Sequence, residues 1–181
     1  MELKKRFENM WQSLYWARQY HEIVKYPPEN YDKNGIYTCD EWTDYSCIGH
    51  KFNGIVLTEE EYLKVENSYI QCAKEIMLKS GCSYLTIARI YKFKHSSKKF
   101  VKFKYRTRVY PCDFDIILRE TLRGRIDCHM VNLRRKYGVY IGYDYYMSLR
   151  SPLDWDTLDE IVRSHGLYLD PRSNKYDYLR E

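Results

Sequence analysis

The stretch Thr58-Glu-Glu-Glu-Tyr-Leu-Lys-Val-Glu-Asn-Ser-Tyr-Ile-Gln-Cys-Ala-Lys-Glu-Ile-Met77 decides the layout of the fold, because it predicts a long amphipathic helix. Thr58 can cap the helix, and Glu61 stands where the carboxylate of a capping box reaches back. Three successive acids suit the positive end of the helix dipole. Gly81 supplies the stop. The apolar side chains recur at steps of three and four: Tyr62, Val65, Tyr69, Cys72, Ala73, Ile76 and Met77.

Upstream of this helix, residues 3–24 also predict a helix. Its apolar side chains again recur at three- and four-residue steps: Leu3, Phe7, Met10, Trp11, Leu14 and Tyr15. Tyr26-Pro27-Pro28 ends it, because a proline keeps the preceding residue out of helical geometry. Residues 28–57 carry turn formers and predict loops with short strands.

Downstream, residues 83–108 predict two antiparallel strands around the polar turn His95–Lys99. In each strand aromatic or aliphatic side chains alternate with basic ones, so the two kinds should occupy opposite faces. The residues expected on the apolar face are Tyr91, Phe93, Val101, Phe103 and Tyr105. Those expected on the basic face are Lys92, Lys94, Lys102, Lys104 and Arg106.

The remaining elements complete a mixed pattern. Residues 114–122 predict a helix, residues 138–147 a central strand, and residues 167–169 an edge strand, while Asp154 or Asp156 caps a short helix ending near His165. We therefore expect a single α+β domain over residues 1–181, with a mostly antiparallel sheet packed against three to four helices.

Composition favours a folded protein of the cytoplasm. The 181 residues are 44% hydrophobic and 30% charged, and they include 20 tyrosines, a residue common in cores and at interfaces. No apolar run is long enough for a membrane span, and the first residues lack the apolar core of a signal peptide. The six cysteines show no CxxC spacing, and a chain this large without a signal peptide argues against a disulfide framework, so we expect reduced thiols, mostly in small buried spaces.

The net charge of +5 hides two opposed blocks. Residues 28–66 hold nine acidic and three basic side chains, a net charge of −6. Residues 74–110 hold eleven basic and one acidic, a net charge of +10. Blocks of this size either steer charged partners or partly neutralise each other in the folded protein.

The sequence shows no constellation typical of catalysis. Cys128 and His129 are adjacent, so on a strand they point to opposite faces. The five histidines lack the spacing of a zinc site, and no glycine-rich phosphate loop is present. Glu59, Glu60, Glu61 and Glu66 could suggest carboxylate chemistry, but we interpret the three consecutive acids at the helix start as partners of the helix dipole. An exposed salt-bridged turn would account for Asp113, Asp115, Arg119, Glu120 and Arg123. We expect no enzyme, no metal ion and no cofactor.

Two surfaces are then candidates for binding. The basic strands could contact nucleic acid through Lys92, Lys94, Lys102, Lys104 and Arg106, or could be the solvent face of an edge hairpin. The acidic block combines carboxylates with aromatic anchors, a pattern suited to a cationic cleft on a partner protein. Its candidate contacts are Asp40, Glu41, Trp42, Asp44, Tyr45, Glu59, Glu60 and Tyr62.

Several of these stretches resemble bacterial immunity proteins encoded beside polymorphic toxins, in particular those of contact-dependent growth inhibition. The resemblance lies in Trp42-Thr-Asp-Tyr-Ser-Cys-Ile-Gly49, Phe52-Asn-Gly54, Leu57-Thr-Glu-Glu-Glu-Tyr-Leu63 with Glu66 and Tyr69, Ile117-Leu-Arg-Glu120 and Gly142-Tyr-Asp-Tyr-Tyr-Met147. Cys47 departs from the family pattern Ser-Asp-Ile-Gly. If the Asp of the family pattern contacts the toxin, this chain either lacks that contact or has a different cognate partner.

The resemblance implies a single-domain, non-catalytic protein of the cytoplasm. Such a protein would bind the C-terminal domain of its cognate toxin and block the active site or substrate surface. The toxins are often nucleases, whose cationic clefts would suit the acidic block. The basic strands could instead meet an acidic toxin surface.

Overall fold

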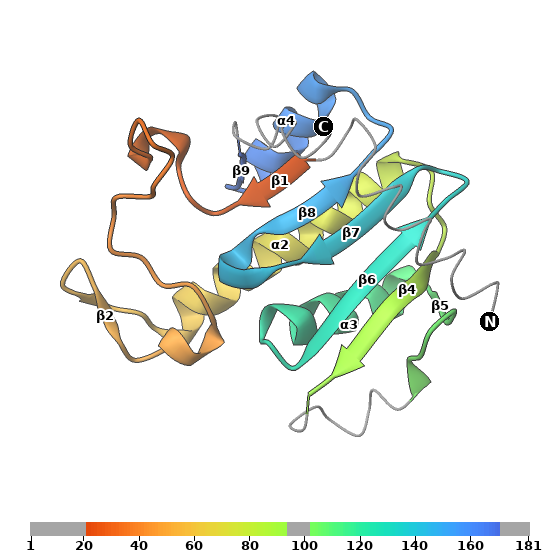
Figure 1. Ribbon diagram of the computed structural model, residues 1–181, viewed down its shortest axis with the longest axis horizontal. Helices are drawn as coiled ribbons and strands as arrows, with labels where there is room; N and C mark the ends of the chain where they lie inside the picture. Colours follow the sequence, from red (N-terminus) through yellow and green to blue (C-terminus); the bar gives the residue numbers. More distant parts are fainter. Residues whose placement is uncertain (1–20, 94–101, 171–181) are drawn as a thin grey trace.

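The computed structural model describes residues 21–93 and 102–170, and a seven-stranded antiparallel sheet is its central element (Figure 1). The strand order is β5-β4-β6-β7-β8-β1-β9. The strands are β1 (His21–Val24), β4 (Leu85–Lys92), β5 (Arg108–Val109), β6 (Ile126–Asn132), β7 (Tyr137–Ile141), β8 (Met147–Arg150) and β9 (Tyr168–Leu169). All pairings between them are antiparallel.

Three helices, α2 (Glu59–Lys79), α3 (Pro111–Leu122) and α4 (Trp155–Ser164), pack on the sheet, with α2 and α3 on the same face (Figure 1). Their apolar stripes and alternate residues of the strands share one hydrophobic core. The expected α+β class, with a mostly antiparallel sheet and packed helices, is confirmed. In the described part of the chain, no helix is long and apolar enough to cross a membrane.

The predicted capping box opens α2. The Glu61 amide donates to Thr58 Oγ1 at 3.2 Å, and the Thr58 amide donates to Glu61 Oε2 at 3.1 Å. Six residues of the predicted apolar stripe are fully buried: Tyr62, Tyr69, Cys72, Ala73, Ile76 and Met77. Asp154 caps α4 by accepting from the Thr157 amide at 2.9 Å, so the predicted short helix is confirmed as well.

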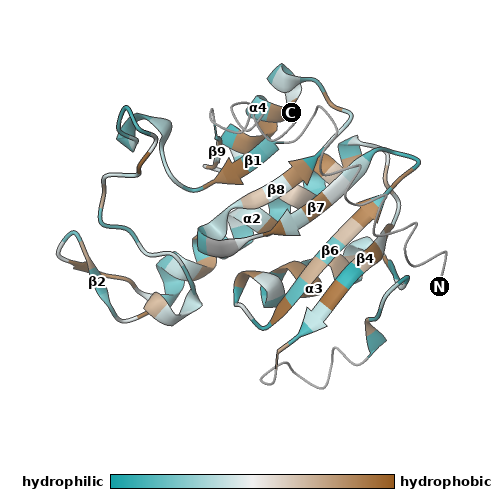
Figure 2. Cartoon of the chain, viewed as in Figure 1, coloured by the Kyte–Doolittle hydropathy of each residue, from teal (hydrophilic) through white to brown (hydrophobic). Residues whose placement is uncertain are grey.

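Hydrophobic and more polar residues alternate along much of the central strands (Figure 2), as expected for strands with one face on the core. The predicted central strand is confirmed as β7, the middle strand of the order. The predicted segment continues through a turn into β8, which pairs with β7 as a hairpin. β6, which the sequence analysis did not predict, lies between β4 and β7 and contributes Ile126, Cys128 and Met130 to the core.

One predicted helix is wrong at its end. Residues 21–24 form β1, which pairs with β8 and β9, instead of finishing a helix from residue 3. Ile23 and Val24 are fully buried there, so β-branched residues fill a sheet position between two partners. The rest of that predicted helix, residues 3–20, lies outside the described residues.

The predicted basic hairpin is wrong in its second strand. Residues 102–106 contain no strand and end in a turn at Tyr105 and Arg106, and β4 pairs with β5 at its start and with β6 over most of its length. Arg106 has a positive φ of 69°, which belongs to a turn and breaks an extended strand. The expected faces also differ, because Tyr91 and Phe93 are exposed while Phe103 is buried. The predicted turn and Lys94 lie outside the described residues.

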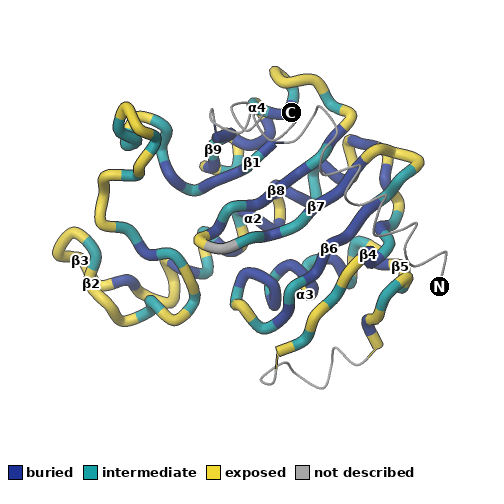
Figure 3. Tube along the Cα trace, viewed as in Figure 1, coloured by how far each residue is buried: buried dark blue, intermediate teal, exposed yellow. Residues whose placement is uncertain are grey.

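Residues 28–57 form the expected loops and short elements. Two single turns of 3-10 helix, η1 (Pro28–Asn30) and η2 (Tyr45–Cys47), precede a small hairpin of β2 (Lys51–Phe52) and β3 (Ile55–Val56). This hairpin is a separate two-stranded sheet, and its tip is exposed (Figure 3). It lies beside the first turns of α2 and extends the molecule at that end (Figure 1).

The cysteines only partly follow the expectation. All six are free thiols, and Cys72, Cys82 and Cys128 are buried as predicted. Cys47 is half-buried, whereas Cys39 and Cys112 are exposed.

Candidate functional site

The aromatic residues of the acidic block turn inward and anchor it to the fold. Trp42 is only 7% exposed and lies between Tyr62 and Tyr145, with ring centroids 5.5 and 5.2 Å away. Tyr62 has no exposed surface. Tyr45 is half-buried and meets Tyr62 edge-on at 5.1 Å. Trp42 and Tyr62 therefore belong to the core and are not available as anchors for a partner.

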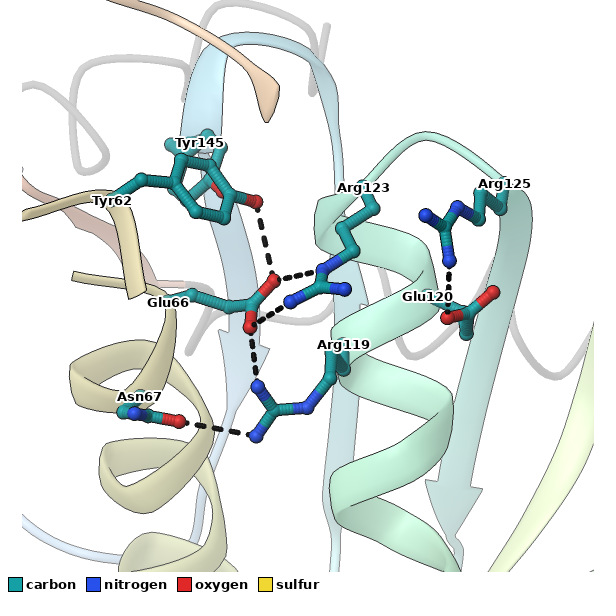
Figure 4. A network of polar contacts seen from close by, with 8 residues as sticks. All are labelled: Tyr62, Glu66, Asn67, Arg119, Glu120, Arg123, Arg125 and Tyr145. Carbon is teal, nitrogen blue, oxygen red and sulfur yellow. Dashed lines mark hydrogen bonds and ion pairs between the residues drawn. The ribbon is translucent and has the colours of Figure 1, made fainter. Parts of the chain in front are cut away.

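A buried carboxylate lies below these rings (Figure 4). Glu66 on α2 has no exposed surface, yet two arginines of α3 and its C-cap reach it. Arg119 Nη1 donates to Oε2 at 2.5 Å, and Arg123 Nε donates to Oε1 at 2.6 Å. The Tyr62 hydroxyl donates to Oε1 at 3.3 Å and accepts a hydrogen bond from Tyr145. The network joins α2, α3 and the β7–β8 turn.

This network corrects one prediction from the sequence. Arg119 and Arg123 do not belong to an exposed salt-bridged turn, because both bind the buried carboxylate of Glu66. The hydrogen bonds from Arg123 to Glu66 raise the pKa of the Arg123 guanidinium, so Arg123 stays charged. Burial raises the pKa of Tyr62 and Tyr145 well above the ordinary value, so both remain neutral donors.

The β7–β8 turn that carries Tyr145 is itself clamped. Asp144 and Tyr145 have φ angles of 55° and 61°, a left-handed conformation that side chains rarely adopt. The Tyr26 hydroxyl donates to the Asp144 carbonyl at 2.8 Å, and the Tyr69 hydroxyl donates to the Tyr145 carbonyl at 2.7 Å. Two tyrosines thus hold the strained turn that places Tyr145 against Trp42.

A second charged pair ties the acidic block to β1. Lys25 Nζ lies 3.0 Å from Glu41 Oε1 and 3.9 Å from the centroid of the Trp42 ring. Its side chain is only 7% exposed. Burial lowers the pKa of Lys25 to about 8, against the opposing effect of Glu41. Glu41 therefore already has an internal partner, although part of it faces solvent.

On the outside, the β2–β3 hairpin and the start of α2 enclose a groove of about 280 Å³, which we call the acidic groove. Its apolar walls come from Trp42, Phe52, Ile55, Val56, Leu57 and Val65, and its polar rim from Asp40, Glu41, Asn53 and Glu61. Ile55 is 69% exposed, and Val56 is also exposed. An open apolar groove with an acidic rim is a form of surface that binds protein partners.

The remaining predicted contacts lie around this groove or hold local structure. Asp40 on the rim accepts from the Asn53 amide at 3.1 Å and so supports the hairpin. Asp44 caps η2 through the Ser46 amide at 2.6 Å. Glu59 and Glu60 are exposed in the first turn of α2, beside Glu61. Ile55 and Val56 were not among the predicted contacts, although Asn53-Gly54 is typical of the tight turn that presents them.

The alternative basic surface is only partly assembled. Lys102 is held by Asp113 at 2.7 Å, Lys104 is exposed, and the Arg106 guanidinium lies 5.5 Å from the Tyr105 ring. On β4, half-buried Lys92 lies beside exposed Tyr91. Between described residues, no ion pair joins the acidic and basic blocks.

Cys128 and His129 lie on β6 with opposite orientations. Cys128 belongs to the core, whereas the His129 ring lies tilted against the Tyr140 ring on the other face, with ring centroids 4.0 Å apart. Burial raises the pKa of the Cys128 thiol far above its ordinary value, which suppresses the thiolate. Within residues 21–93 and 102–170, no group of three or more His, Cys, Asp or Glu side chains could hold a metal ion.

No family model, curated protein or solved structure matches this chain. The fold and the site therefore define it only as an α+β protein whose acidic block is anchored by buried aromatic side chains that pack in the core. That block presents an acid-rimmed apolar groove to solvent.

Proposed function

We propose that the protein is an immunity protein, which binds the C-terminal domain of a cognate toxin in the cytoplasm and blocks its active site or substrate surface. The acidic groove is the contact surface. The observation that carries the proposal is the combination, in one groove, of exposed Ile55 and Val56 with the acidic rim. The resemblance of the same segment to immunity proteins supports the choice of partner.

The chemistry of the groove favours a basic partner with an apolar anchor. Burying Ile55 and Val56 would supply affinity, because apolar burial drives association. The carboxylates would supply orientation and fast encounter with a cationic surface such as that of a nuclease. The core contacts of Trp42 and the Glu66 network keep the groove in shape before binding, which lowers the entropic cost of association.

Co-expression with the C-terminal domain encoded by the neighbouring toxin gene tests the proposal. The two proteins should co-purify, and growth of the toxin-expressing cells should be restored. Ile55→Lys should abolish both effects, because it places a cation in the apolar groove. Ile116→Lys, at a similarly exposed apolar residue of α3, should behave like wild type. If the wild-type protein neither co-purifies with the toxin domain nor restores growth, the proposal is overturned.

One observation favours a second candidate function, nucleic-acid binding. Tyr91 and Phe93 are exposed at the end of β4 with ring centroids 5.1 Å apart, and Arg89 is exposed on the same strand. Exposed aromatic rings beside cations are a stacking platform for single-stranded nucleic acid. This candidate predicts RNA binding that falls steeply with salt and is lost in Tyr91→Ala/Phe93→Ala. RNA binding that survives both substitutions would exclude it.

A further inference from the structure

The far end of α2 holds a second hollow, distinct from the acidic groove. It encloses about 350 Å³ and is lined by Gly81, Ser83, Tyr84, Asn132, Arg134 and Arg135. A smaller hollow of about 170 Å³ adjoins it and shares Tyr84, Asn132 and Arg134. Because α2 has 21 residues, its two ends lie about 30 Å apart. In Figure 1 the β2–β3 hairpin and the β6–β7 turn lie at opposite ends of the molecule.

Within the part of the chain that the structure describes, the arginines of this end have no carboxylate partner. Elsewhere in the described chain, five arginines are ion-paired: Arg89, Arg119, Arg123, Arg125 and Arg163. Between described residues, no ion pair involves Arg108, Arg134 or Arg135. Arg108 instead lies 4.7 Å from the ring centroid of Tyr84, which is a wall of the hollow. Positive charge that no described carboxylate pairs with therefore gathers around one cavity.

Local structure holds this cationic cavity in place. Asn132 donates to the Tyr84 carbonyl at 2.9 Å and accepts from the Arg135 amide at 3.2 Å, so it fixes the β6–β7 turn beside the end of α2. The Arg135 guanidinium packs over Gly81, 3.4 Å from where a Cβ would stand. The positive φ of Gly81 and this close approach both favour glycine there.

The two hollows differ in chemistry. The larger one offers guanidinium groups and the Ser83 hydroxyl, which are donors suited to phosphate oxygens. The smaller one adds Thr86, Val131 and Leu133, whose side chains suit an apolar or aromatic group. A ligand that fills both carries a phosphate at one end and a flat, weakly polar group at the other.

We propose that this cavity binds a nucleoside phosphate, with the phosphate between Arg134 and Arg135 and the base in the smaller hollow against Tyr84. The site is independent of the acidic groove and of the proposed toxin contact. It requires no chemical step, and its ligand would act as a bound effector.

Calorimetric titration of the full chain with AMP, pyrophosphate and adenosine tests the site. AMP and pyrophosphate should bind saturably, with AMP tighter, and adenosine should bind far more weakly than either. Arg134→Ala/Arg135→Ala should weaken AMP binding by at least about tenfold, because charge-assisted hydrogen bonds to phosphate are lost. Arg163→Ala, which removes an exposed arginine on α4, should leave AMP binding unchanged.

Three outcomes would overturn the assignment. The first is no saturable AMP binding by the wild-type chain, and the second is equal weakening by the double variant and by Arg163→Ala. The third is AMP binding no tighter than pyrophosphate, which would remove the base from the smaller hollow. Circular dichroism of the double variant confirms that it is folded, as expected for two exposed turn residues. Toxin binding is a separate readout, so failure of either proposal leaves the other standing.

Discussion

Glu66 on α2 and Arg123 at the end of α3 are joined by two hydrogen bonds, Nε to Oε1 at 2.6 Å and Nη2 to Oε2 at 3.0 Å. Arg119 adds a third contact to the same carboxylate. Because Glu66 is fully buried, this paired geometry compensates the loss of its hydration. The two helices and the acidic block are therefore held at one fixed point.

Removing this charge should destabilise the fold. Glu66→Gln should lower the free energy of unfolding by about 3 kcal/mol, toward the lower end for a broken buried pair, because Arg119 keeps partial access to water. Urea denaturation measures this difference. Glu60→Gln, an exposed neighbour at the start of α2, should cost less than about 1 kcal/mol. Similar losses for the two variants would contradict a central role for Glu66.

The capping box should contribute separately. Thr58→Ala removes the side-chain acceptor of the Glu61 amide and should cost about 1 kcal/mol in urea denaturation. Thr58→Ser keeps that hydroxyl and should lie within about 0.5 kcal/mol of wild type, since serine caps as well as threonine. An equal loss in both variants would show that the methyl group, and not the cap, matters.

Lys25 should make stability depend on pH in the alkaline range. Its pKa is about 8 in the folded protein and 10.5 ordinarily, so between these values the unfolded chain binds more protons. The contribution of Lys25 to stability should therefore rise from pH 8 to 10.5. Urea denaturation at several pH values should show wild type gaining on Lys25→Met across that window. A constant difference between the two proteins would contradict the lowered pKa.

Thiol reactivity should follow burial. Cys39 and Cys112 are exposed and should react first with a thiol reagent under native conditions. Burial raises the pKa of Cys82 to about 11 and that of Cys72 and Cys128 further, so these three should react far more slowly. In urea all six should react. Mass spectrometry of the labelled sites distinguishes them, and fast native labelling of Cys128 would revive a nucleophilic role.

Much of the fold could be predicted from local sequence signals. The capping box of α2, the Asp154 cap of α4 and the strand formers of β7 act within a few residues, so the sequence shows them directly. The prediction of the basic hairpin was wrong because strand pairing depends on contacts far apart in the sequence. Over most of its length β4 pairs with β6, about forty residues downstream, and not with the basic segment at residues 101–106.

The acidic character of the candidate site was predictable from the sequence, but the orientation of its side chains was not. The exposed acids at Glu59 and Glu60 follow from their place in the first turn of α2. The burial of Trp42 depends on Tyr145, a residue about one hundred positions away in a strained turn. The role of Arg119 and Arg123 was predicted wrongly for the same reason, because their partner Glu66 lies on another helix. Their packing is visible only once the chain has folded.

The dissociation constant of the complex with the neighbouring toxin domain tests the central claim most directly. Asp40→Asn/Glu59→Gln/Glu60→Gln should weaken binding by at least about tenfold at low salt, by losing three charges around the acidic groove. Glu29→Gln/Asp156→Asn/Glu160→Gln makes the same charge change at exposed positions away from it and should bind like wild type. Equal dissociation constants for the two triple variants would contradict the assignment of the acidic groove as the contact surface.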